Sequence, residues 1–227
     1  MNRPKRNRPD PVPGPVTATS VQARDPNRMS VFVDEEFSFG MPLDAALDLG
    51  IRTGVELDEA LLAKCLAAEA AFRARQKALN LLAHRPRSVG ELTRRLGMAG
   101  FSGEAIAFAM GRMEALGYLN DEAFAESFVR DRMIMRGLGR RRVLMELTKN
   151  GIGRELAEQV VARISLSRDE VADAYNLAVK KHRTLARVTD PRKRRERLYS
   201  HLVRKGFETD IIRDALARLQ AEVGTED

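Results

Sequence analysis

A pattern that recurs three times restricts what this 227-residue chain can fold into. Each copy has a leucine, a glycine four residues later, an apolar residue directly after the glycine, a polar break and then an amphipathic run. The leucine, glycine and apolar positions are Leu96, Gly100 and Phe101; Leu147, Gly151 and Ile152; and Leu202, Gly206 and Phe207. The pattern predicts a helix that ends, a glycine that caps it in the left-handed conformation, and an apolar side chain that folds back onto that helix.

Each copy therefore predicts a helical hairpin with a preceding helix, and one such unit cannot cover its own apolar face. We expect an all-α chain in which three three-helix repeats stack into an elongated, curved tandem array. Unrelated glycine caps are the alternative, but the glycines are spaced 51 and 55 residues apart, in phase with their flanking runs. We place a linking helix and repeat 1 at 58–119, repeat 2 at 120–166 and repeat 3 at 167–223.

Two segments of different character precede the repeats. Residues 1–28 hold six of the nine prolines and few apolar residues, which predicts a disordered basic tail. Residues 29–57 form a small acidic leader in which 30–41 alternate weakly, with a turn at 34–36, and predict a short β-hairpin. The tail either attracts polyanions weakly or is a leader without such a role.

Capping residues mark several helix starts. Ser88 and Ser167 are each followed three residues later by a glutamate, which fits a capping box. Asp190 stands before a proline, Asn120 before two acids, and Asp58 before a long periodic run.

The charged residues are distributed unevenly. The chain carries 39 Lys and Arg against 32 Asp and Glu, a net charge of +7. Residues 29–70 carry −7, whereas the windows 130–154 and 180–205 carry +6 and +9. Both windows lead into the first hairpin helix of a repeat, so stacking would align them in one basic stripe. A basic stripe suits a polyanion, because neutralised phosphates release counterions. A solvated face that aids solubility is the alternative.

The predicted polyanion-binding residues are cations of these two windows. In repeat 2 they are Arg130, Arg132, Arg136, Arg140, Arg141, Arg142, Lys149 and Arg154. In repeat 3 they are Arg183, Arg187, Arg192, Lys193, Arg194, Arg195, Arg197, Arg204 and Lys205.

Base stacking is not expected to contribute to binding. The chain has no tryptophan and three tyrosines, and stacking platforms need exposed aromatic rings. Tyr118 and the phenylalanines have core-like helical spacing, so we expect them to be buried. Binding would then be directed at a nucleic-acid backbone or a protein–DNA assembly.

The sequence contains no convincing catalytic or metal-binding constellation. Its three histidines are far apart in the sequence, and none lies near Cys65. Cys65 falls on an apolar helix face and is expected to be a buried thiol. Asp121 and Glu122 could form half of a metal site, but a helix cap explains them as well. We expect no enzyme, no metal and no cofactor. A single cysteine and the lack of a long apolar run favour a cytoplasmic protein without a membrane span.

The amino-acid sequence resembles that of the RecX family, the regulatory proteins of the RecA recombinase. The resemblance is carried by the segments ALNLLAHRPRSVGELTRRL (78–96), GYLNDEAFAESFVRDR (117–132), GLGRRRVLMELTKNGI (137–152) and RERLYSHLVRKGFETDIIRDAL (195–216). Residues 30–58 are similar to the acidic, strand-containing leader of some members. The tail at 1–28 departs from the family pattern.

The resemblance implies a monomeric binding protein of homologous recombination, DNA repair and the SOS response. Family members bind RecA filaments on DNA, inhibit RecA ATP hydrolysis and strand exchange, and favour filament disassembly. The expected partners are thus the RecA filament and the backbone of single- and double-stranded DNA. The basic block of repeat 2 would contact the filament, and the family's structural signature would comprise Gly100, Tyr118, Phe124, Phe128, Leu147, Gly151, Ile152 and Gly206.

Two other classes of function remain open. The helical hairpins could act as helix-turn-helix units of a stand-alone DNA-binding protein, which would bind selected sequences without RecA. A nuclease would require Asp121 and Glu122 to hold a metal ion.

Overall fold

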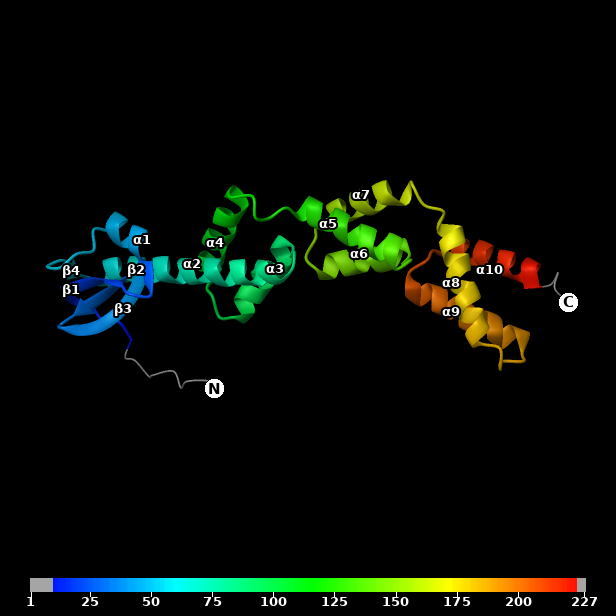
Figure 1. Ribbon diagram of the computed structural model, residues 1–227, viewed down its shortest axis with the longest axis horizontal. Helices are drawn as coiled ribbons and strands as arrows, with labels where there is room; N and C mark the ends of the chain where they lie inside the picture. The colour runs from blue at the N-terminus through cyan, green and yellow to red at the C-terminus, as the bar shows by residue number, and fades with distance from the viewer. Residues whose placement is uncertain (1–9, 224–227) are drawn as a thin grey trace. The chain divides into compact units, whose positions relative to one another are not determined.

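The computed structural model describes residues 10–223 of the chain (Figure 1). These residues form two units: the first comprises the chain up to Arg85 together with Thr93–Leu116, and the second comprises Pro86–Leu92 together with the chain from Gly117 onward. Three-helix repeats and a small antiparallel strand element confirm the predicted fold class. No helix among the described residues is long and apolar enough to cross a membrane.

The first unit contains a four-stranded antiparallel sheet of strand order β3-β2-β1-β4. Its strands are β1 (Gly14–Gln22), β2 (Asp25–Val33), β3 (Glu36–Pro42) and β4 (Glu56–Leu57). The predicted hairpin is β2–β3, and its turn holds Asp34 and Glu35 at positive φ angles of 50° and 66°.

The prediction of a disordered tail is wrong for residues 14–28, which form β1 and part of β2. Strand β1 buries Val16 and pairs along β2, and the Val16 N–H also donates to the Val55 carbonyl at 2.9 Å. Its order thus comes from backbone pairing with distant residues, which the low apolar content of the segment does not reveal. Residues 1–9 of the predicted tail lie outside the described residues.

Helix α2 (Glu59–His84) connects the sheet to α4 (Gly103–Ala115) within the first unit (Figure 1). At its N-terminal end Cys65 joins the core of the sheet, together with α1 (Leu43–Asp48). Further along, Ala74 packs against Ala105 and Ala109 of α4, because small side chains allow two helices to approach closely.

The second unit contains repeats 2 and 3. Repeat 2 consists of α5 (Asp121–Val129), the π-helix η1 (Arg130–Met135), α6 (Arg140–Lys149) and α7 (Arg154–Ser165). Repeat 3 consists of α8 (Glu170–Thr184), α9 (Pro191–Lys205) and α10 (Thr209–Val223). Helix α3 (Val89–Met98) begins in this unit and ends in the first.

The three predicted glycine caps are confirmed. Gly100, Gly151 and Gly206 have φ angles of 87°, 86° and 90°. The apolar residue after each cap donates its N–H to the carbonyl of the leucine that defines the repeat: Ile152 bonds to Leu147 at 3.1 Å, with equivalent bonds in the other two copies.

Four of the five predicted helix-start residues are confirmed, and one is wrong. Asp58, Asn120 and Asp190 are N-caps whose side chains accept backbone N–H groups, and the Ser88 hydroxyl accepts the Glu91 N–H at 3.0 Å. Ser167 instead donates to the Ile164 carbonyl, and the carboxylate of Asp169, closer to the helix, caps α8.

Candidate nucleic-acid interface

Helices α6 and α9 begin with cations where helices usually carry acids. Arg140, Arg141 and Arg142 open α6, and neither helix has an acidic residue in its first turn. In α9 the corresponding cations are Arg192 and Lys193, with Arg194 next. The positive end of a helix dipole disfavours cations by a few tenths of a kcal/mol or more. This placement does not help either helix form, and it concentrates positive charge at two helix starts.

Two backbone hydrogen bonds join the start of α6 to the end of α9. The Gly139 N–H donates to the Lys205 carbonyl at 3.0 Å, and the Arg141 N–H donates to the Gly206 carbonyl at 3.1 Å. The first N–H groups and the last carbonyl groups of a helix have no partner within that helix. Here N–H groups at the start of α6 donate to carbonyl groups at the end of α9. The two basic windows therefore meet at this contact, the α6–α9 junction, defined by residues 139–142 and 204–206.

Glycine is required at the junction because the backbones lie in contact. A Cβ atom added at Gly139 would overlap the Gly206 carbonyl group, and one added at Gly206 would overlap the backbone of Arg142. A similar contact occurs at the other side of repeat 2, where a Cβ on Gly90 would lie 2.7 Å from the Gly151 carbonyl oxygen. Sequence reasoning found Gly151 and Gly206 as caps but missed their partners.

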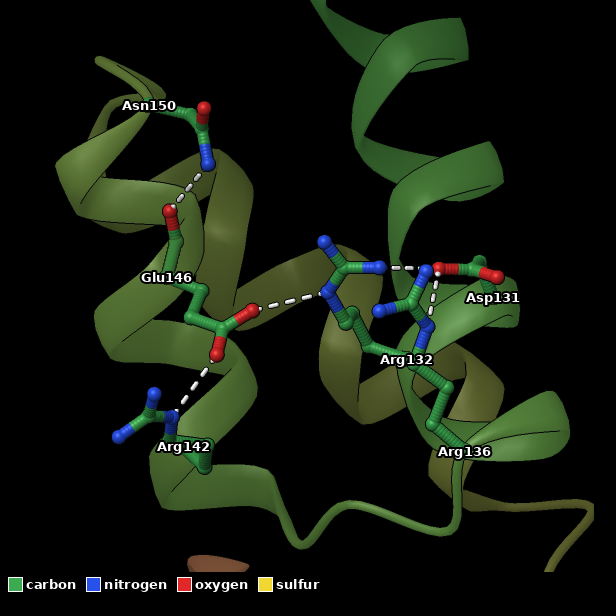
Figure 2. A network of polar contacts seen from close by, with 6 residues as sticks. All are labelled: Asp131, Arg132, Arg136, Arg142, Glu146 and Asn150. Atoms are coloured by element: carbon green, nitrogen blue, oxygen red, sulfur yellow. Dashed lines mark hydrogen bonds and ion pairs between the residues drawn. The ribbon is translucent and has the colours of Figure 1, made fainter.

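Part of the predicted basic block is neutralised within repeat 2 (Figure 2). The Glu146 carboxylate accepts from Arg132 and from Arg142, each at 2.8 Å. Arg132 also pairs with Asp131 and stacks on the Phe128 ring at 4.5 Å. Burial acts to raise the pKa of Glu146, but the hydrogen bonds from the two arginines outweigh it and lower the pKa. Glu146 is thus charged and stabilises the repeat.

Several other predicted interface residues have structural contacts. Arg136 pairs with Asp131 at 3.1 Å and Arg154 with Glu158 at 2.7 Å. In repeat 3, Arg194 donates to the Val188 carbonyl. Others lie near polar neighbours: Arg140 near Glu170, Arg183 near Tyr175, Arg195 near Gln220 and Lys205 near His201. Lys149 also has an interaction partner within the protein.

The side chains of the remaining predicted cations are exposed and make no hydrogen bond or ion pair within the described part of the chain. They are Arg130, Arg141, Arg187, Arg192, Lys193, Arg197 and Arg204. Four of them lie on α9, which makes this helix the richest source of available positive charge among the described elements.

Alignment on the glycine caps shows which cations the repeats share. Arg142 corresponds to Arg197, and Lys149 corresponds to Arg204, since the two members of each pair stand the same number of residues before their glycine caps. At the equivalent places repeat 1 has Glu91 and Met98. The shared cations therefore belong to repeats 2 and 3, both in the second unit.

The expectation that Tyr118 is buried is wrong. Its side chain is 58% exposed, because it follows Gly117 in the connection between α4 and α5 and not within a helix. Phe108 on α4 is also exposed. Phe124 and Phe128 are half-buried and pack against the core of repeat 2.

Asp121 and Glu122 have other partners than a metal ion. The Asp121 carboxylate accepts the Val89 N–H at 2.8 Å, and Glu122 pairs with Arg163. No group of three or more potential metal-ligating side chains occurs among residues 10–223.

Comparison with known proteins identifies the family of the chain. The RecX N-terminal domain model matches residues 14–58, and the models of the first, second and third RecX three-helix domains match 74–113, 120–161 and 168–216. Regulatory protein RecX of Bacillus licheniformis is 30% identical over 91% of this chain and 78% of its own length. That of Clostridium perfringens is 27% identical over 91% of this chain and 96% of its own length.

Solved structures agree with this assignment. A crystal structure of regulatory protein RecX matches the fold with a TM-score of 0.71 at 21% identity, covering 89% of this chain and all of that one. RecX from Lactobacillus salivarius matches with a TM-score of 0.59 at 26% identity, covering 68% of this chain and 99% of that one. Its four matching domains and a relative that is 30% identical show that the chain belongs to the RecX family of regulatory proteins.

Proposed function

We propose that this protein binds RecA filaments assembled on DNA, inhibits RecA ATP hydrolysis and strand exchange, and promotes filament disassembly. Its partners would be RecA and the backbone of single- and double-stranded DNA. It would act as a cytoplasmic monomer without catalytic activity. Membership of the RecX family supports a regulatory role. The observation that carries the proposal furthest is the α6–α9 junction, where two helices of consecutive repeats bring their cations together.

The junction suits a polymeric target because it holds its cations at a fixed spacing. Backbone hydrogen bonds join the two helices, so less conformational entropy is lost when a ligand binds. Several modest contacts on one filament add up through multivalency. Tighter binding to one filament state than to another would shift the filament equilibrium toward that state.

DNA-stimulated ATP hydrolysis by RecA, measured with increasing amounts of this protein, tests the proposal. Inhibition at stoichiometric amounts is expected. A triple variant, Arg141→Glu, Arg197→Glu and Arg204→Glu, should inhibit much less, because these side chains are exposed and make no ion pair within the described residues. The triple variant Arg52→Glu, Arg73→Glu and Arg112→Glu in the first unit is the matched control and should inhibit like wild type. Absence of inhibition by the wild-type protein would refute the proposal.

A further inference from the structure

Repeats 2 and 3 have corresponding positions in their first helices as well as in their hairpins. Asn120 and Asp169 are both N-caps that accept an N–H three residues later. Counting from these caps, the buried Ala125 corresponds to the buried Ala174, and Arg132 corresponds to Lys181. Counting from the glycine caps, Glu146 corresponds to His201 and Arg142 to Arg197.

The network around Glu146 thus has a counterpart in repeat 3 that lacks the carboxylate. In repeat 2 the Glu146 carboxylate lies between Arg132 and Arg142 and pairs with both (Figure 2). In repeat 3 the position of Glu146 is taken by His201, on which Lys181 acts, and Arg197 lies one helical turn before His201 on α9. The same architecture therefore holds positive charge without its internal counter-ion.

The surroundings of His201 add to this excess of positive charge. Burial, followed by Lys205 and Lys181, lowers the pKa of His201, and Arg204 acts in the same direction. Burial is the largest cause of this shift, and the charged groups that add to it, Lys205, Lys181 and Arg204, are all cations.

The elements packed around α9 do not supply a balancing carboxylate among the groups that act on His201. On α10, Arg213 pairs with Asp214, and Glu222 is bound to Arg218 and Tyr175. Asp210 lies in the first turn of that helix. The start of α6, which meets α9 at the junction, adds further cations.

We propose that this surface is a binding site for a backbone phosphate of DNA, a proposal that rests on the DNA binding inferred above. The site, called the His201 cluster, comprises Lys181, Arg197, His201, Arg204 and Lys205. A phosphate there supplies the negative charge that the Glu146 carboxylate supplies in repeat 2. The neutral imidazole can donate one hydrogen bond to it and becomes a stronger donor when protonated.

The exposed cations of α9 favour a nucleic-acid strand over a single carboxylate. Lys193, Arg197 and Arg204 lie on one face of the helix, at positions i, i+4 and i+11. Along the axis these spacings are about 6 and 10 Å at 1.5 Å per residue. A row of cations matches a chain of repeating anions, and each phosphate that is neutralised adds to the release of counterions.

The test places a carboxylate in the cluster, as in repeat 2. The probe is a fluorescent single-stranded dT oligonucleotide, with binding to the full-length protein measured by anisotropy over a range of salt concentrations. His201→Glu should weaken binding by about fivefold or more, as expected when a negative charge is introduced beside a bound phosphate. It should also reduce the slope of log K against log salt by about 0.7 for each phosphate that the variant no longer neutralises. His84→Glu, the same substitution at the exposed end of α2, is the matched control and should match wild type.

A second measurement does not depend on any variant in the cluster keeping its fold. The NMR titration of the His201 ring in the wild-type protein should show a higher pKa with saturating dT oligonucleotide, because a bound phosphate favours imidazolium. By the same linkage, dT affinity should rise as the pH falls from 7.5 to 6, and His201→Gln should reduce that rise. An unchanged His201 pKa on dT binding would overturn the proposal.

The other outcomes separate this inference from the proposed function. If His201→Glu retains dT affinity but loses binding to RecA without DNA, the cluster serves an acidic protein surface and the inference fails. If the wild-type protein inhibits RecA and His201→Glu binds dT like wild type, the inference fails alone. If His201→Glu loses dT affinity but the wild-type protein does not inhibit RecA, the proposed function fails and the phosphate site stands.

Discussion

The substitution Gly139→Ala tests whether the α6–α9 junction holds repeats 2 and 3 together. Gly139 is buried and has a φ of −77°, an angle that alanine adopts without strain. Any destabilisation must therefore come from contacts and from the helix start, because a Cβ there overlaps the Gly206 carbonyl group.

The magnitude follows from what the added methyl group displaces. Overpacking at a close contact costs about 1–3 kcal/mol. Separating the backbones to relieve it weakens the hydrogen bonds from Gly139 to Lys205 and from Arg141 to Gly206, each worth about 0.5–1.5 kcal/mol. The expected loss is about 2–6 kcal/mol, a large share of the roughly 5–15 kcal/mol that stabilises a typical domain.

Gly153→Ala is a matched control for this substitution. Gly153 is also the N-cap of a helix, has a φ of −58°, and has no atom within 4 Å of the position of an added Cβ. Both variants replace glycine by alanine at an N-cap, so the difference between them isolates the junction. Urea unfolding and hydrogen exchange of the Arg141 amide should both show the loss in Gly139→Ala. Equal unfolding midpoints and equal exchange in the two variants would refute the reasoning.

Further predictions concern the cap, the cations, the network and the thiol. Gly151→Val should lower the melting temperature far more than Gly153→Val, because a β-branched residue tolerates the φ of 86° poorly and its Cβ would meet Gly90; equal melts would contradict the cap. Arg141→Glu should weaken binding to RecA–DNA filaments in a pull-down and leave the circular-dichroism melt unchanged. Adding charge reversals at Arg140 and Arg142, which lie beside Glu170 and Glu146, should also lower stability. Unchanged filament binding by Arg141→Glu would argue against the interface. The pKa of Glu146 is lower in the folded state than in the unfolded one, so its contribution to folding stability is present above pH 4.5 and is lost as the pH falls through the folded pKa. Glu146→Gln should therefore lose less stability between pH 7 and pH 3.5 than the wild-type protein. An equal loss in the two proteins would contradict the network. Burial raises the pKa of Cys65 to about 11, so a disulfide reagent should label it slowly at pH 8 in the folded protein and rapidly in urea; rapid labelling of the folded protein would contradict its burial.

The site shows where sequence reasoning succeeds and where it fails. The basic windows were visible as charge, but their charge alone did not reveal that Glu146 pairs with Arg132 and Arg142 whereas the Arg197 side chain has no ion pair within the described residues. His201 could have been found by aligning the repeats on their glycine caps, since it stands where repeat 2 has Glu146. Its cationic surroundings also depend on Lys181, which reaches it from another helix.

By itself, the sequence determined the features that arise within a few residues. The left-handed glycines, the helix ends that they cap and the β2–β3 turn were predictable, because local sterics and hydrogen bonds set these conformations. Only the tertiary structure decided the order of β1, the contact of Gly139 with Gly206, and which cations have partners. The physical reason is that these features depend on atoms far apart in the chain, whose approach the local pattern does not encode.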